Sequence, residues 1–162
     1  MNQQKEVAYL VNETEDSILV KITGRASYLN CQPLSNYLLQ ALKRSCKKFC
    51  FYFEDCIAID STCLGILAGI ALKAEVCIFK GVPKRPLESI RQVGLDSLVQ
   101  IVEGNADSKE ILHQMELQKA SNEINSCKRE EILKAHQLLV EIDQQNRMRF
   151  KDVLQLLENE NK

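Results

Sequence analysis

The amino-acid sequence predicts an α/β fold built on a mixed β-sheet. Residues 6–12 and 17–23 alternate between apolar and polar side chains, as half-buried strands do. Residues 49–53 and 76–79 are short apolar runs, which are typical of central strands buried on both faces. A segment with helical periodicity lies between these two runs. This alternation of strand and helix implies that the later strands are mostly parallel and that helices pack on the sheet.

The first third of the chain predicts a strand hairpin followed by a helix. Residues 13–16 are polar and predict the connection of the hairpin, and Gly24 ends its second strand. Pro33 suits the first turn of a helix. The apolar side chains of this helix recur on one face, at Leu34, Tyr37, Leu38, Ala41 and Leu42.

The middle of the chain continues with a helix that starts near Thr62 and ends near Lys73. Its two glycines, Gly65 and Gly69, are four residues apart and therefore share one face. Glycine lowers helix propensity, so we expect tight packing to compensate, with this bare face lying close to the sheet.

Two further helices and a strand are predicted before residue 118, so about four helices in all pack on the sheet. Pro86 opens a short helix that Gly94 ends. Residues 98–102 predict an edge strand. Residues 107–115 predict another helix, which Asp107 can cap.

The C-terminal part of the chain predicts a pair of amphipathic helices. Residues 119–127 are polar and predict a linker or a frayed helix. Residues 143–146 separate two apolar stripes, and Asp143 can cap the second helix; one long helix is the alternative, because no Gly or Pro forces a break. We predict a helical hairpin whose apolar faces are buried against the rest of the chain, a second copy or another protein. The stripes consist of Ile132, Ala135, Leu139 and Ile142, and of Phe150, Val153, Leu154 and Leu157.

Composition argues against several classes of function. The net charge of −1 gives no field that favours nucleic acid or an anionic membrane. The apolar stretches are too short to span a bilayer, and no N-terminal apolar stretch resembles a signal peptide. The seven cysteines include no CxxC pair with metal-ligand spacing. We expect a cytoplasmic protein with reduced thiols and no metal or other cofactor.

The remaining reactive residue types predict structural roles. The histidines, His113 and His136, lie in helical, charge-rich contexts without ligand-spaced partners, so a solvated or capping role is favoured. Residues 43–48 hold a basic cluster at a helix end, which favours the helix electrostatically and is not interpreted as an RNA site. No nucleophile elbow, P-loop or dinucleotide fingerprint is present, so we expect no enzyme activity.

One segment carries a specific pattern: Asp60, Ser61 and Thr62 stand where an apolar strand-like run gives way to the helix near Thr62. The first amide N–H groups of a helix lack partners within it and carry partial positive charge, so a phosphoryl group is well accommodated there. All three residue types are also good N-caps, and a simple cap is the alternative interpretation.

The segment A-I-D-S-T-C-L-G-I-L at residues 58–67 resembles the signature Asp-Ser-Ser/Thr-Gly-Leu-Gly of STAS domains of the anti-sigma-factor antagonist family. Gly24-Arg25 and Val93-Gly94-Leu95 resemble weaker features of that family, and the order of elements matches the STAS fold over residues 5–118. The chain departs from the family pattern at Cys63, where glycine is usual, and at Ser27, where many members have aspartate. The resemblance implies a STAS domain at residues 1–118 and a helical extension at residues 119–162.

The resemblance also implies a function. The family members bind a serine-kinase anti-sigma factor when unphosphorylated, and a serine phosphatase reverses the phosphorylation. Ser61 is then the phospho-acceptor, with Thr62 as the second choice. The residues expected to contact the partner are Asp60, Ser61, Thr62, Cys63, Leu64, Gly24 and Ser27. The alternative function is a STAS interaction or scaffold module that is not phosphorylated, for example one accessory to transport. We expect a monomer or a homodimer formed through the C-terminal helices.

Overall fold

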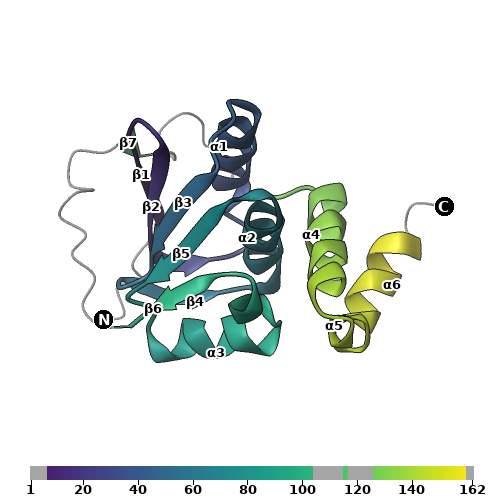
Figure 1. Cartoon of the computed structure of the whole chain (residues 1–162). Helices are drawn as coiled ribbons and strands as arrows, with labels where there is room; N and C mark the ends of the chain where they lie inside the picture. Colours follow the sequence, from purple (N-terminus) through teal and green to yellow (C-terminus); the bar gives the residue numbers. More distant parts are fainter. Residues whose placement is uncertain (1–6, 104–114, 117–125, 160–162) are drawn as a thin grey trace, which may run out of the picture.

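The computed structural model describes residues 7–103, 115–116 and 126–159. These residues form an α/β fold with a mixed sheet, as the sequence predicts (Figure 1). The strands are β1 (Ala8–Glu13), β2 (Ser17–Ala26), β3 (Lys48–Tyr52), β4 (Cys56–Ile59), β5 (Val76–Lys80), β6 (Gln100–Val102) and β7 (Met115–Glu116). The helices are α1 (Gln32–Lys43), α2 (Ser61–Lys73), α3 (Lys84–Gln92), α4 (Arg129–Ile142), α5 (Gln145–Arg149) and α6 (Lys151–Asn159), with a 3₁₀ turn at Leu95–Ser97.

The described strands pair in the order β6-β5-β3-β2-β1-β7, with β4 paired to β2 outside this path. The neighbours β2, β3, β5 and β6 run parallel, whereas β1 is antiparallel to β2 and to β7. Strand β2 changes partner at Gly24, where the register shifts and φ is 77°. Glycine adopts this left-handed backbone without a steric penalty, so β2 leaves β3 and continues beside β4.

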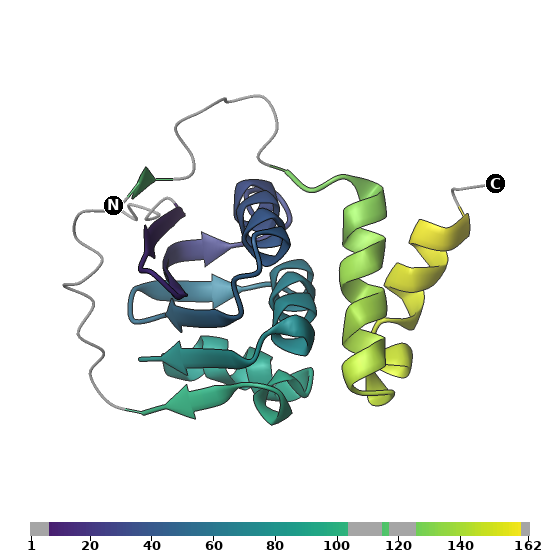
Figure 2. The same cartoon turned by 45° about the horizontal axis from the view of Figure 1, so that its top comes forward.

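Helices α1, α2 and α3 lie over one face of the sheet (Figure 2). The core between them is rich in aromatic side chains, and the rings of Phe51 and Phe79 pack edge to face with centroids 5.6 Å apart. Alternate residues of the same strands form a smaller cluster on the other face, made of Leu19, Cys50 and Tyr52. This division confirms the alternation predicted for residues 17–23.

The C-terminal helices pair as a hairpin, as predicted. Helix α4 contacts α2 on one side and α6 on the other, so α2, α4 and α6 follow one another outward from the sheet in both views (Figures 1 and 2). The helix break falls at residues 143–144, and the predicted second helix is divided at Phe150 into α5 and α6. The Asp143 carboxylate accepts the backbone N–H of Gln145 at 3.0 Å, and the fully buried Asn146 donates to the carbonyls of Val93 and Leu139 at 2.9 and 2.6 Å.

Several sequence predictions need correction. The glycine face of α2 lies against α4 instead of the sheet: a Cβ built on Gly65 would fall 2.3 Å from the carbonyl oxygen of Ala135. Strand β4 was not predicted. Met115 pairs with β1 in β7 and is not helical. Residues 107–114 of the predicted helix 107–115 and residues 119–125 of the predicted linker 119–127 lie outside the described residues. In the second stripe Leu157 is buried, but Val153 is 38% exposed.

Candidate functional site at the start of α2

The site forms where β4 ends and α2 begins. Asp60 is the N-cap of α2, and one carboxylate oxygen accepts the backbone N–H of Cys63 at 3.0 Å. The other oxygen accepts the backbone N–H of Tyr28 at 2.8 Å. A single side chain therefore caps the helix and fixes the loop that follows β2 to it. The capping interpretation of this segment is correct for Asp60.

Ser61 is the first residue of α2, and its side chain points toward the C-terminal helices. Its Oγ atom forms a hydrogen bond of 2.8 Å with Nε2 of His136, 75 positions later in the chain. Ser61 is half-buried, whereas His136 is only 2% exposed. The serine that the sequence singles out is thus in contact with α4.

The surroundings of His136 define the direction that this hydrogen bond has when the ring is neutral. Its Nδ1 atom lies 2.7 Å from the carbonyl oxygen of Ile132, which can only accept, so Nδ1 carries a proton. In the neutral ring Nε2 is then the acceptor, and the hydroxyl of Ser61 donates to it. The ring of Phe150 packs edge to face on the imidazole at 5.1 Å and helps to fix its orientation.

A serine hydroxyl that donates to a neutral imidazole is also the pairing that activates serine nucleophiles. Enzymes of that kind add a third group that orients the base. Here the orienting group is a carbonyl of the same helix, at Ile132, and it is not a carboxylate. The arrangement fixes the position of Ser61, and we assign it no catalytic role.

The other predicted site residues lie in different environments. Thr62, Cys63 and Leu64 are 3%, 2% and 2% exposed, so their side chains belong to the core as the chain is folded here. Burial raises the pKa of the Cys63 thiol, and a reactive thiolate at the helix start is therefore not supported. Cys63 is helical and does not require the positive φ that glycine would permit.

Gly24 and Ser27 border the site at the end of β2. Gly24 is buried at the register shift described above. The hydroxyl of Ser27 accepts the backbone N–H of Leu29 at 3.2 Å, and the backbone N–H of Ser27 donates to the Asn30 side chain at 2.9 Å. Both residues shape the loop that Asp60 holds.

That loop, residues 27–30, presents the exposed part of the site. Tyr28 and Leu29, which are adjacent in the sequence, are 45% and 59% exposed. The hydroxyl of Tyr9 in β1 donates to the side-chain oxygen of Asn30 at 2.8 Å and so holds the loop to the sheet. A second hydrogen bond holds the loop to the residues before α4: the backbone N–H of Cys127 donates to the carbonyl of Tyr28 at 2.6 Å.

The entry to the C-terminal helices thus adjoins the same loop. The sulfur atoms of Cys31 and Cys127 are 3.3 Å apart, and both side chains are buried. The hydrogen bond with Cys31 and burial together raise the pKa of the Cys127 thiol. These contacts place loop 27–30, the start of α2 and the start of the hairpin in one cluster.

His136 is the site residue that the sequence analysis assigned wrongly. It was expected to be solvated or to act as a cap, and the structure buries it against Ser61. Its position could have been recognised, because it is four residues after Ile132 and three before Leu139 and so lies on the apolar stripe of α4. His113 lies outside the described residues.

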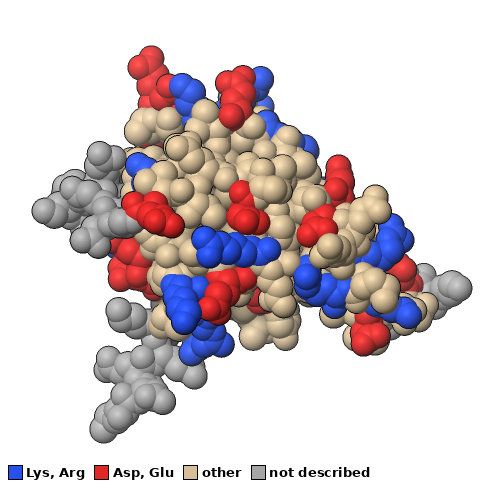
Figure 3. Space-filling view, turned by 60° about the horizontal axis from the view of Figure 1, so that its bottom comes forward, with Lys and Arg blue, Asp and Glu red and all other residues tan. Residues whose placement is uncertain are grey.

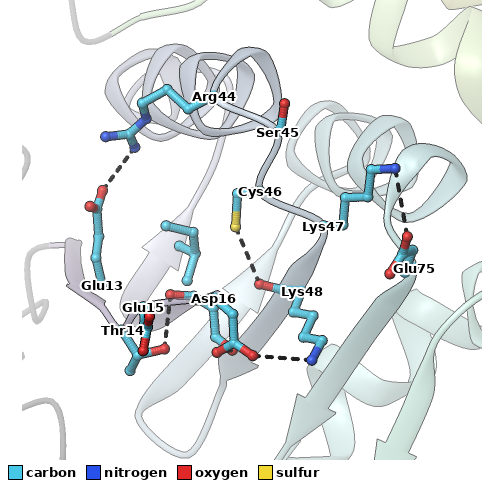
Figure 4. A pocket seen from close by; sticks show the side chains of 12 residues that line it. Glu13, Thr14, Glu15, Asp16, Arg44, Ser45, Cys46, Lys47, Lys48 and Glu75 are labelled. Carbon is cyan, nitrogen blue, oxygen red and sulfur yellow. Dashed lines mark hydrogen bonds and ion pairs between the residues drawn. The ribbon is translucent and has the colours of Figure 1, made fainter.

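The basic cluster at residues 43–48 is paired with acidic residues around a cavity of about 440 Å³ (Figure 4). Arg44 pairs with Glu13 at 2.8 Å, Lys48 with Asp16 at 3.1 Å, and Lys47 with Glu75 at 3.6 Å. Positive and negative side chains are similarly interspersed on the face shown in Figure 3. These ion pairs join the cluster to β1, to the hairpin connection and to the residue before β5.

A second cavity, of about 470 Å³, lies between α1, α2 and α4. Its walls are mainly apolar and include Leu39, Gly69 and Leu138, with Gln32 on the α1 side. The cavity exists because α4 rests on α2. It is therefore a consequence of the docked position of the hairpin.

No protein-family model matches this sequence, and no curated protein matches it either. Among the described helices, none combines the length and the apolar character needed to cross a membrane. Within residues 7–103, 115–116 and 126–159, no three His, Cys, Asp or Glu side chains gather as metal ligands. The candidate site thus rests on the geometry around Ser61.

Proposed function

We propose that this chain is a protein-binding module of the STAS type that is switched by phosphorylation of Ser61. In this proposal it acts in the cytoplasm as an anti-sigma-factor antagonist and binds a serine-kinase anti-sigma factor while Ser61 is unmodified. A serine phosphatase restores the unmodified state. The resemblance of residues 58–67 to the family signature is the sequence basis of the proposal.

The observation that supports it most is the position of Ser61 at the start of a 13-residue helix, directly after an aspartate whose carboxylate is held by two backbone N–H groups. The positive end of the helix stabilises a phosphate on Ser61. The phosphate adds roughly −1.5 to −2 charges near neutral pH, next to Asp60. A partner that binds this surface would meet that charge, whereas the sheet would change little.

The buried state of Thr62 favours Ser61 as the acceptor. A kinase must bring the hydroxyl to the γ-phosphate of ATP, and Thr62 is 3% exposed inside the first turn of α2. Ser61 is half-buried and needs only the release of His136.

The test is to incubate the purified chain with ATP and the serine-kinase anti-sigma factor from the same genome, and to map the phosphopeptides. We expect phosphate on Ser61, none on Ser61→Ala, and retained phosphorylation on Thr62→Val. Phosphorylated chain should bind the kinase more weakly than the unmodified chain. Phosphate on Thr62 alone, or equal binding by both forms, would contradict the proposal.

The Ser61–His136 hydrogen bond favours a second candidate, a STAS interaction module that is not phosphorylated. In that case the hydroxyl has a structural partner and the surface works by contact alone. The same experiment separates the two candidates, because this module would bind its partner without taking up phosphate.

A further inference from the structure

The contact between α2 and α4 is among the most extensive between described elements. It follows the face of α2 that carries Ser61, Gly65 and Gly69, which recur every four residues and therefore form one stripe. We call this stripe the α2 face, and residues 129–159 the C-terminal hairpin.

The shape of the α2 face fits a helix with a small residue at its centre. A Cβ atom on Gly65 would fall 2.3 Å from the carbonyl oxygen and 2.7 Å from the Cβ of Ala135. The two backbones thus touch at this point, which only a glycine opposite a small side chain permits. One helical turn along α2, a Cβ on Gly69 would fall 3.0 Å from the flexible end of Leu138, so the packing is looser there.

The polar end of the α2 face is matched as well. Ser61 finds an acceptor in His136, which lies next to Ala135 on α4. Complementarity in shape at Gly65 and in hydrogen bonding at Ser61 therefore defines the kind of segment that this face accepts. It is an amphipathic helix with a small residue over Gly65 and a hydrogen-bond acceptor over Ser61.

The two helices of this contact are far apart in the sequence. Helix α2 ends at Lys73 and α4 begins at Arg129, so a long stretch of the chain separates them. A segment of the same chain competes with a free ligand through its effective concentration, which does not depend on the concentration of the protein.

We infer that the α2 face is the docking surface for a helix of the partner protein, and that α4 occupies it as an intramolecular competitor. This inference rests on the proposed function for the existence of a partner. Partner binding then requires the C-terminal hairpin to leave the α2 face. Phosphorylation also requires its departure, because the hydroxyl of Ser61 is bonded to a buried imidazole.

The experiment uses the hairpin itself as the probe. A fluorescent peptide of residues 128–159 is titrated into the full chain, and binding is followed by anisotropy. In the full chain with Ala135→Arg, the long side chain cannot pack against Gly65, so the tethered hairpin leaves the α2 face. We expect this variant to bind the peptide at least 10-fold more tightly than the wild-type chain, whose own hairpin competes.

Gln137→Arg is the matched control, because residue 137 is exposed on α4 and the same charge is added there. The control should bind the peptide as weakly as the wild-type chain. If circular dichroism shows that Ala135→Arg is unfolded, Ala135→Leu provides the same overpacking without a charge.

Equal affinity of the folded variant and the wild-type chain for the peptide would overturn the inference. The test needs neither kinase nor phosphate, so its failure is separate from failure of the proposed function. Phosphorylation at Ser61 without peptide binding would support the proposed function and contradict the inference that the hairpin competes for the α2 face. Tight peptide binding to the Ala135 variant supports the docking surface even where Ser61 takes up no phosphate.

Discussion

The hydroxyl of Ser61 at the start of α2 and Nε2 of His136 in α4 are 2.8 Å apart. The two residues are 75 positions apart in the sequence, and their hydrogen bond joins the proposed phosphorylation site to the C-terminal hairpin. Any change at Ser61 therefore reaches α4 directly, through a buried imidazole.

The Ser61–His136 hydrogen bond should be measurable as a coupling free energy. We expect a double-mutant cycle with Ser61→Ala and His136→Ala to give a coupling of about 0.5–1.5 kcal/mol in the free energy of unfolding, because a net hydrogen bond contributes that amount. Urea unfolding of the four proteins provides the data. Single effects that add to within about 0.3 kcal/mol would show that the two side chains act independently.

The two glycines of α2 should respond differently to the same substitution. Gly65→Ala places a methyl group against the Ala135 backbone, so we expect a loss of about 1–3 kcal/mol in stability through overpacking. Gly69→Ala meets only the movable end of Leu138 and gains helix propensity, so its effect should be smaller or even stabilising. Thermal unfolding of both variants compares the sites. A Gly65→Ala variant as stable as the wild type would mean that α4 does not rest on α2 as described.

Asn146 should be required for the attachment of the hairpin. Its amide donates to the carbonyls of Val93 and Leu139, and its oxygen accepts from Arg149 at 2.6 Å. Asn146→Ala leaves two buried carbonyls without this donor, so we expect a loss of about 2 kcal/mol or more. The exposed Gln155→Ala serves as the control, and urea unfolding measures both. Equal stability of the two variants would argue against this role.

Stability should fall at alkaline pH because of buried thiols. Burial raises the pKa of Cys56 and of Cys77 to about 12 each, whereas a thiol in the unfolded chain has a pKa of about 8.5. Because the pKa of each thiol is higher in the folded protein than in the unfolded chain, each thiol stabilises the fold. This contribution to the free energy of unfolding is complete below about pH 8.5 and is lost as the pH rises toward about 12. Each thiol contributes a slope of about 1.4 kcal/mol per pH unit in that window.

We therefore expect Cys77→Val to reduce the slope of unfolding free energy against pH between about pH 9 and pH 11. The neighbouring Val76→Ala removes no titrating group and should leave the slope unchanged. Urea unfolding at several pH values measures it. The same slope in the wild type and in Cys77→Val would count against a buried, protonated Cys77.

The sequence predicts most of the sheet and its helices because each has a local signal. A period of two predicts the strand at residues 17–23, and an apolar run predicts the strand at 49–53. The backbone freedom of glycine predicts the end of a helix at Gly94. Strand β4 has four residues, Cys56–Ile59, which is too short for a period to be recognised, and it pairs with β2 only because the register shifts at Gly24. That shift is a tertiary event without a local signal.

The candidate site is only partly predictable for a similar reason. Asp60 and Ser61 lie at a strand-to-helix junction that the residue types indicate. An apolar stripe in α4 shows that one face is buried, but it does not identify the surface that buries it. For this reason Gly65 was assigned to the sheet and His136 to solvent, although the two lie on facing helices.

The central claim is that the C-terminal hairpin is held on the α2 face by the hydrogen bond between Ser61 and His136 and by the close contact at Gly65, so that replacing the Ser61 hydroxyl loosens it. Hydrogen exchange of the amides of residues 129–142 tests it most directly, in the wild-type chain, in Ser61→Asp and in the exposed control Ser97→Asp. We expect Ser61→Asp to exchange these amides at least 10-fold faster than the other two proteins, while β2 and β3 keep their protection. Unchanged protection of residues 129–142 in a folded Ser61→Asp variant would contradict the claim.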